Sequence, residues 1–274
     1  MRLRDFRPRL LAASVALLVA ACATTTSPTG RRQVVGAVSQ QQLDQMGEQA
    51  FAQLRAQKAQ TNDARQRNYA ACVVSAVVRE LPAQWQNYRW ESAVFVDNNP
   101  NAFALPGGKV GLYTGIFSVA RTQDQMAGVI AHEIGHVVAN HHNERITRQM
   151  GAQGVLEILG ALAGARYGQG AASAVTQGGG ILAQTGFLLP GSRQQESEAD
   201  VVGQQLMARA GFDPRQAVNL WQNMIAASGG SRPPQWLSTH PDPTARLNEM
   251  NQRALSLMPE YERARAAGKR PNCG

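Results

Sequence analysis

Two histidines and a glutamate stand inside an otherwise apolar segment, and this segment limits the fold more than any other feature. His132, Glu133 and His136 lie within residues 122–148, where a capping box that starts at Thr122 predicts the beginning of a helix. Buried ionisable groups are costly unless they are paired or bound to a metal ion. Residues four apart share one helix face, so His132 and His136 can bind the same ion. Glu133, the next residue along the helix, is placed to act as a general base.

An acidic segment further along the chain offers the third protein ligand that a catalytic zinc site needs. Glu196 and Asp200 are four apart on a helix predicted over 195–210, so they share a face, while Glu198 points roughly the other way. We expect Glu196 to bind the metal and Asp200 to orient a ligand histidine through its second ring nitrogen. The alternative is a solvated acidic helix start that the macrodipole favours.

HExxH, followed on another helix by Glu-x-x-Ala-Asp, resembles the gluzincin endopeptidases related to HtpX and the CAAX prenyl proteases. The chain resembles their periplasmic lipoprotein branch, which includes BepA and LoiP. The resemblance covers residues 98–247 and implies an α+β fold, a mainly helical metallopeptidase domain with a small β-sheet whose edge strand binds substrate. It implies one zinc ion per chain, bound by His132, His136 and Glu196, and peptide hydrolysis with Glu133 as the base.

The resemblance extends to a segment before the active-site helix. Asn101, Ala102, Phe103 and Ala104 precede a Pro-Gly-Gly turn, and the family pattern implies that they form an edge strand for an extended substrate. A plain structural hairpin is the alternative.

The loop residue His240 and the arginine six residues after it also match the family. The resemblance implies that His240 approaches the metal or the substrate, and in BepA-like members the corresponding histidine can hold the enzyme inactive. It implies that Arg246 stabilises the developing oxyanion. The alternative is a loop histidine followed by an arginine at a helix start. His141 and His142 are interpreted as structural, since His141 lies off the predicted ligand face.

The N-terminal segment has the pattern of a secretory signal. Residues 1–21 combine a basic start with an apolar run, and small residues precede Cys22, which resembles a bacterial lipobox. The resemblance implies lipidation of Cys22 and stable membrane anchoring. Ala23 after the cysteine favours the outer membrane, with the protein facing the periplasm. An uncleaved anchor is the alternative, and residues 22–38 are predicted to be a flexible tether.

The distribution of charge bears on whether the protein binds nucleic acid. Removal of residues 1–21, which carry four Arg and one Asp, lowers the formal net charge from +8 to +5. The remaining arginines are scattered, so no nucleic-acid partner is expected.

Cys72 and Cys273 can pair in an oxidising compartment, and two unpaired thiols are the alternative.

A single domain over residues 39–258 is the simplest organisation, followed by a C-terminal tail over 259–274. A glycine-rich insertion over 151–191 is either a lid over the site or a disordered loop. The other predicted elements are helices over 39–60, 62–81, 214–228 and 243–258 and strands over 90–97, 101–105 and 109–113.

The resemblance implies misfolded or stalled envelope proteins as substrates, hence a role in protein quality control. One alternative is a latent zinc-bearing chaperone or scaffold with little turnover, and another is a housekeeping peptidase for small peptides. The sequence carries no indication of an oligomeric state.

Overall fold

The computed structural model describes residues 23–151, 192–227, 240 and 243–274, and these divide into two units. The larger unit comprises residues 40–142 and 189–274, and the smaller one residues 1–39 and 143–188. The predicted signal peptide, Cys22 and residues 152–191 of the glycine-rich insertion lie outside the described residues. Among the helices that the structure describes, none combines the length and hydropathy that a membrane span requires.

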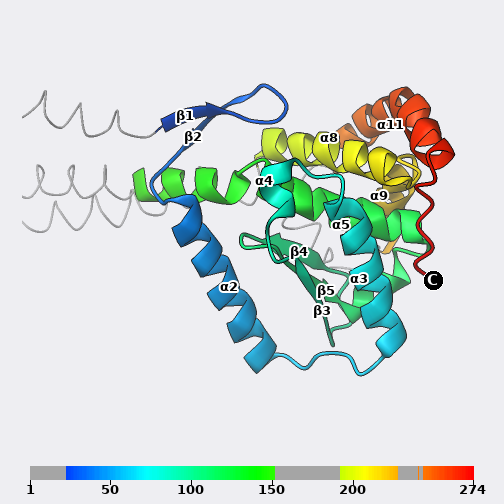
Figure 1. Ribbon diagram of the computed structural model, residues 1–274, viewed down its shortest axis with the longest axis horizontal. Coiled ribbons are helices and arrows are strands. Elements are labelled where there is room, and N and C mark those ends of the chain that lie inside the picture. The colour runs from blue at the N-terminus through cyan, green and yellow to red at the C-terminus, as the bar shows by residue number, and fades with distance from the viewer. Residues whose placement is uncertain (1–22, 152–191, 228–239, 241–242) are drawn as a thin grey trace, which may run out of the picture. The chain divides into compact units, whose positions relative to one another are not determined.

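A three-stranded sheet lies in the larger unit, in the order β3-β5-β4 (Figure 1). Strand β5 (Lys109–Tyr113) pairs in parallel with β3 (Glu91–Phe95) and antiparallel with β4 (Ala102–Leu105), as a hairpin over these residues predicts. Gly107 and Gly108 form its turn with φ angles of 78° and 75°, a conformation that glycine adopts at little cost.

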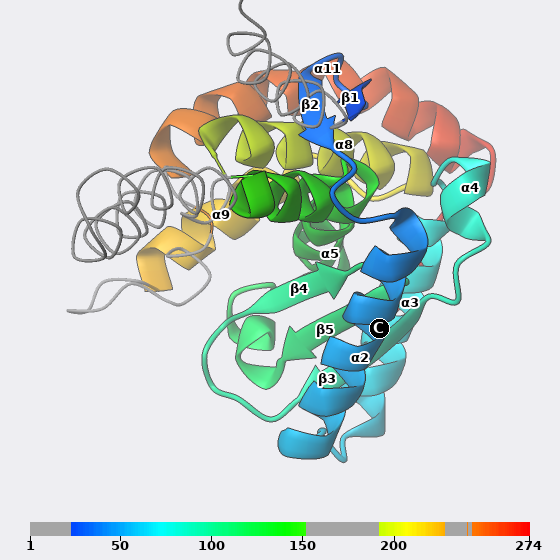
Figure 2. The same cartoon turned by 90° about the vertical axis from the view of Figure 1, so that its left-hand side faces the viewer.

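Helices pack on the strands. Helix α3 (Ala64–Val78), capped by the Asp63 side chain, packs on β3, and α2 (Gln40–Gln57) packs against the β4–β5 hairpin (Figure 2). Gly47 of α2 allows this approach, because a Cβ atom there would lie 2.2 Å from the carbonyl oxygen of Pro106. A short helix, α4 (Ala83–Gln86), precedes β3, and the 3₁₀ helix η1 (Thr114–Ser118) follows β5.

Four further helices lie in the described part of the larger unit. They are α5 (Gln123–Val138), α8 (Arg193–Ala210), α9 (Gln216–Ala227) and α11 (Pro243–Ala266). Helix α5 packs against α8, α9 and β4, and α8 also packs against α11 (Figure 1). Every residue of α5 from Gln125 to Val138 is buried, so the helix that carries the metal-ligand motif is also the centre of the core. This arrangement confirms the predicted α+β, mainly helical fold.

Two helix boundaries differ from the prediction. The helix predicted over 122–148 is interrupted after Val138, where Asn140 has a φ angle of 56°, and helical structure resumes over 141–151. Helix α11 passes through Pro259, although the sequence predicts an end there and a tail over 259–274. Proline removes the bond to the carbonyl of Leu255, but this residue is exposed, so water can serve that carbonyl. Beyond the proline, Ala264 is buried and supports the helix.

The smaller unit corrects the prediction of a flexible tether over 22–38. Strand β1 (Ala23–Thr26) pairs antiparallel with β2 (Arg32–Val35). Arg31 donates to both carboxylate oxygens of Glu144, at 2.9 and 2.7 Å, and Glu144 is fully buried. The buried carboxylate requires this partner, and such a distant pairing leaves no trace in the local composition.

A disulfide joins Cys72 of α3 to Cys273, which decides between the two alternatives that the sequence left open. The residues next to Cys273 also contact Gln123, the first residue of α5. The amide of Gln123 donates to the carbonyl of Pro271 at 2.9 Å and accepts from the backbone N–H of Cys273 at 3.0 Å. Residues 271–273 therefore connect the middle of α3 to the beginning of α5.

Candidate metal centre

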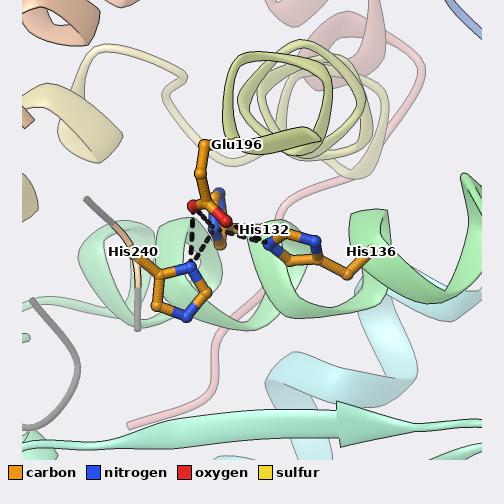
Figure 3. Close-up of side chains that lie close together, drawn as sticks. All are labelled: His132, His136, Glu196 and His240. Atoms are coloured by element: carbon orange, nitrogen blue, oxygen red, sulfur yellow. Dashed lines mark hydrogen bonds and ion pairs between the residues drawn. The ribbon is translucent and has the colours of Figure 1, made fainter. Parts of the chain in front are cut away.

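The two histidines of the HExxH motif lie one turn apart on α5, with their rings directed to the same point (Figure 3). Thr122 caps the helix by accepting a hydrogen bond from the backbone N–H of Gln125. The Nε2 atoms of His132 and His136 are 3.1 Å apart. Both side chains are buried, so the sequence has placed two nitrogen ligands on one face of a core helix.

Glu196 enters the same site from α8. Its Oε2 lies 3.5 Å from Nε2 of His132 and its Oε1 lies 3.6 Å from Nε2 of His136. Ser192 caps α8 through the backbone N–H of Gln195, one residue before this glutamate. The predicted third ligand is thus brought to the two histidines, although sixty positions separate it from them in the sequence.

Two glycines allow α5 and α8 to approach this closely. A Cβ atom on Gly135 of α5 would lie 3.0 Å from the carbonyl oxygen of Ala199, and one on Gly203 of α8 would lie 3.0 Å from the backbone nitrogen of His132. These distances are tighter than ordinary van der Waals contacts. Close contact between the backbones of α5 and α8 therefore sets the distance between Glu196 and the two histidines.

His240 completes the cluster from the segment before α11 (Figure 3). Its Nδ1 lies 2.7 Å from Oε2 of Glu196 and 3.2 Å from Nε2 of His132. Its Nε2 lies 3.4 Å from Oε1 of Glu133, which brings the predicted general base to the edge of the cluster. The structure therefore brings the predicted residues His132, Glu133, His136 and Glu196 together. His240 lies beside them, with its Nδ1 among the ligand atoms.

The cluster fits a divalent metal ion. One ligand atom from each of His132, His136, Glu196 and His240 lies within 4.8 Å of all the others. The Oε1 atom of Glu196 is buried and makes no hydrogen bond in the part of the chain that the structure describes. Three imidazoles and one carboxylate are a donor set that zinc prefers, and the ligand atoms of a tetrahedral zinc lie roughly 3.3 Å apart.

Burial and charge act in opposite directions on the ligands. Burial lowers the pKa of His132, but hydrogen bonds with Asp200 and Glu196 outweigh it and raise that pKa to about 9. Burial lowers the pKa of His136 well below its usual range. Burial raises the pKa of Glu196, but the neighbouring histidines His132 and His240 outweigh it and hold that pKa far below its usual range. The carboxylate is therefore ionised and ready to accept a cation.

Asp200 lies where the sequence predicts, beside the outer nitrogen of the first ligand. Its Oδ1 is 2.9 Å from Nδ1 of His132. Arg246 donates to Asp200 at 2.7 and 2.8 Å and to Glu196 at 3.1 Å, and it lies over the ring of Trp221 at 4.3 Å. Burial raises the pKa of Asp200, but Arg246 and His132 outweigh it and lower that pKa. The predicted oxyanion role of Arg246 disagrees with this geometry, because its donors are directed at two buried carboxylates.

Two further residues, His141 and Glu198, contact this site without having been predicted from the sequence. Nδ1 of His141 lies 2.7 Å from Nδ1 of His136, and Nε2 of His141 lies 3.0 Å from Oε2 of Glu198. Both residues are buried. The interpretation of His141 as lying off the ligand face assumed a continuous helix, and the break at Asn140 invalidates it. The sequence signal that could have revealed the break is an asparagine, which tolerates positive φ, directly after the apolar run.

The predicted substrate strand forms the edge of the sheet as far as the structure describes it. Residues Ala102, Phe103 and Ala104 belong to β4, and Asn101 directly precedes it. Ala102 and Ala104 are buried in the same core cluster as α5, while Phe103 turns to the opposite face and covers Gly111. Small side chains therefore allow β4 to pack against the helix that carries the metal ligands.

The fold and the site define a class of protein, namely metallopeptidases that combine an HExxH helix with a glutamate ligand from a second helix. The chain belongs to peptidase family M48, whose model matches residues 63–254. This span includes every residue that we assign to the metal centre. Family membership confirms the predicted resemblance and supports the predicted enzyme class, a metalloendopeptidase.

Individual relatives agree with this assignment. The chain is 35% identical over 185 residues to the mitochondrial metalloendopeptidase OMA1 of Schizosaccharomyces pombe, covering 65% of this chain and 51% of that protein. It is 32% identical over 227 residues to the beta-barrel assembly-enhancing protease of Escherichia coli, covering 78% of this chain and 44% of that protein. The chain thus spans about half the length of these curated relatives.

Proposed function

We propose that this protein is a zinc-dependent endopeptidase that hydrolyses peptide bonds in misfolded or stalled envelope proteins. The observation that supports it most is the convergence of Glu196 from α8 on His132 and His136 of α5, with Glu133 beside them. These residues would hold one zinc ion, which supplies Lewis-acid chemistry by polarising the scissile carbonyl and making water a better nucleophile.

The chain's own residues perform the proton transfers in this proposal. The Glu133 carboxylate accepts a proton from the attacking water and delivers it to the leaving amine. Asp200 keeps the outer nitrogen of His132 occupied, so that Nε2 faces the metal. The β4 edge binds an extended substrate through main-chain hydrogen bonds, which select for unfolded chain more than for sequence. This selection suits a quality-control protease.

The proposal includes a location. A lipid on Cys22 would hold the protein at the outer membrane with its site facing the periplasm, and the signal-like residues 1–21 would be removed. Mass spectrometry of the wild type and of Cys22→Ser tests the lipid directly. The expected result is an acylated N-terminal peptide in the wild type alone.

A second candidate function is a latent zinc-bearing chaperone or scaffold, and the position of His240 favours it. Its Nδ1 lies among the ligand atoms, where it would compete with water and substrate for the metal. Removal of this side chain distinguishes a latent enzyme from a scaffold.

Zinc content and casein hydrolysis of the full chain test the proposed function. We expect about one zinc per chain in the wild type and in Glu133→Gln, and its loss in Glu196→Ala. We expect His240→Ala to cleave casein and His240→Ala with Glu133→Gln to leave it intact. Zinc in Glu196→Ala would show that the ligand assignment is wrong. Zinc binding without cleavage by any variant would favour the scaffold.

The substrate class is tested with the most active variant. Cleavage rates are compared for a folded outer-membrane β-barrel protein, the same protein unfolded, and a short peptide from its sequence. Preference for the unfolded protein is expected. Preference for the short peptide would instead support a housekeeping peptidase.

A further inference from the structure

The helix that carries the second histidine ligand is interrupted shortly after it. Helix α5 ends at Val138, and Asn140 adopts a left-handed conformation with a φ angle of 56°. In a continuous helix, a residue five positions after His136 would point about 140° away from it. The break instead places His141 beside that histidine, with ring centroids 4.9 Å apart and the two Nδ1 atoms at 2.7 Å.

The other ring nitrogen of His141 contacts a carboxylate of α8. Its Nε2 lies 3.0 Å from Oε2 of Glu198, and the His141 side chain is fully buried. Glu198 is 3% exposed, although an acidic residue near a helix start is usually solvated. A carboxylate in this position is costly without a partner, and the structure supplies one that also touches a predicted metal ligand.

The geometry fixes the direction of these hydrogen bonds when a metal is bound. His136 faces the cluster with Nε2, so its Nδ1 carries the hydrogen. Nδ1 of His141 must then accept that hydrogen bond, which leaves the ring proton of His141 on Nε2. This Nε2–H donates to Glu198. The chain of donors thus runs from His136 through His141 to the carboxylate.

The two ligand histidines are therefore supported by the same helix in two ways. Asp200 of α8 accepts directly from Nδ1 of His132, at 2.9 Å. Glu198 stands two positions earlier on α8, so its side chain leaves the helix in nearly the opposite direction. It reaches the second ligand only because His141 stands between them.

We propose that His141 and Glu198 are positioning residues that fix the tautomer and ring orientation of His136 for metal binding. This inference rests on the proposed function in one respect, that the cluster holds zinc. A buried histidine–carboxylate pair that serves the fold alone is the competing explanation. The two explanations differ in what they predict for metal affinity.

Two substitutions at the same position separate them. Both His141→Asn and His141→Phe lose the ring nitrogen that meets Glu198. Asparagine keeps an acceptor, Oδ1, close to the place of Nδ1, whereas phenylalanine has none. A role in folding alone predicts similar effects on zinc affinity, while a positioning role predicts that asparagine rescues what phenylalanine loses.

The dissociation constant of zinc is measured on the full chain by competition with a chromophoric chelator. We expect His141→Phe to weaken binding by about 10- to 100-fold, the range for partners of ligand histidines. We expect His141→Asn to recover most of this loss and Glu198→Gln to lose less than His141→Phe. His142→Asn, at the neighbouring histidine, is the matched control and should bind as the wild type does.

The absorption spectrum of the cobalt-substituted protein gives a second readout. Reorientation of His136 changes the ligand field, so the visible bands should shift in His141→Phe and Glu198→Gln but not in His142→Asn. If His141→Phe does not fold, the cobalt spectra of His141→Asn and Glu198→Gln test the positioning role in its place.

Equal zinc affinity of wild type and folded His141→Phe, with identical cobalt spectra, would overturn the inference and leave the proposed function standing. If His141→Phe does not fold, wild-type spectra in both His141→Asn and Glu198→Gln would overturn it in the same way. Absence of zinc from the wild type would overturn both.

Discussion

Arg246 binds Asp200 in the protein interior with two donors, Nε 2.7 Å from Oδ2 and Nη2 2.8 Å from Oδ1. The same guanidinium reaches Glu196, so one cation compensates the charges of a predicted ligand and of the residue that orients another. Removing it leaves two buried carboxylates with too few partners. This relationship gives the first prediction.

Arg246→Ala is expected to lower the free energy of unfolding of the metal-free protein by about 3–5 kcal/mol, the cost of breaking a buried ion pair. Arg246→Lys should recover part of this, since an ammonium group cannot form the two-pronged contact. Urea unfolding measures both. Arg209→Ala, which breaks the exposed pair with Glu260, is the control and should cost at most about 1 kcal/mol. Unchanged stability with lost turnover would instead favour the oxyanion role.

His240→Ala is expected to raise the rate of casein hydrolysis relative to the wild type. The imidazole has one nitrogen among the ligand atoms and the other 3.4 Å from Glu133, so its loss opens a position for water and substrate. Hydrolysis rates at equal zinc content provide the measurement. A rate that falls would show that His240 assists the reaction.

Gly203→Ala is expected to weaken zinc binding and to destabilise the fold. The added methyl group would lie 3.0 Å from the backbone nitrogen of His132, so α8 must move away and carry Glu196 with it. Chelator competition and thermal unfolding measure the two effects. Gly151→Ala is the matched control, because a Cβ atom there meets nothing within 4 Å. Similar effects of both substitutions would contradict the explanation.

Replacing the disulfide with Cys72→Ser and Cys273→Ser is expected to cost about 2–5 kcal/mol of stability, because the bond closes a very long loop of the unfolded chain. Urea unfolding with and without reductant measures this. Reductant should destabilise the wild type and leave the double variant unchanged. Equal stability of the wild type and the double variant without reductant would show that the contacts of Gln123 hold residues 271–273 by themselves.

Zinc binding is expected to strengthen as pH rises from about 6 to 9, by about tenfold per pH unit. The pKa of His132 in the metal-free protein is raised to about 9, so below that pH zinc must displace a proton from this residue. Above pH 9 the affinity should level off. Asp200→Asn removes a partner that raises this pKa, so its affinity should level off at lower pH. Titrations at several pH values measure both curves, and a flat wild-type curve would contradict the prediction.

The sequence predicted the parts of the site that local rules determine. Positions four apart on a helix place His132 with His136 and Glu196 with Asp200, and both pairs lie as expected. Local rules do not determine the partners of Arg246, because Asp200 and Glu196 precede it by 46 and 50 positions, and its oxyanion role stays a prediction. Distant pairing also explains why residues 22–38 looked like a tether. Their polar composition hides the ion pair between Arg31 and Glu144.

One left-handed residue accounts for the largest omission. The pattern of apolar positions continues past Val138, so periodicity alone extends the helix and turns His141 away from the site. Asn140 interrupts the helix with a positive φ angle. Such a break costs little for asparagine, and the pattern of hydrophobic residues does not reveal it.

The position of Cys273 has a consequence for the order in which this protein is made. Its partner, Cys72 in the middle of α3, is synthesised some two hundred residues earlier, and the residues next to Cys273 contact Gln123 at the beginning of α5. While the chain is still growing, α3 and α5 lack this connection, and Glu196 and Asp200 lack Arg246. A nascent chain therefore contains the complete HExxH motif before it contains Arg246 and Cys273, whose contacts support that motif. The residues that secure the motif are therefore synthesised after the residues that form it.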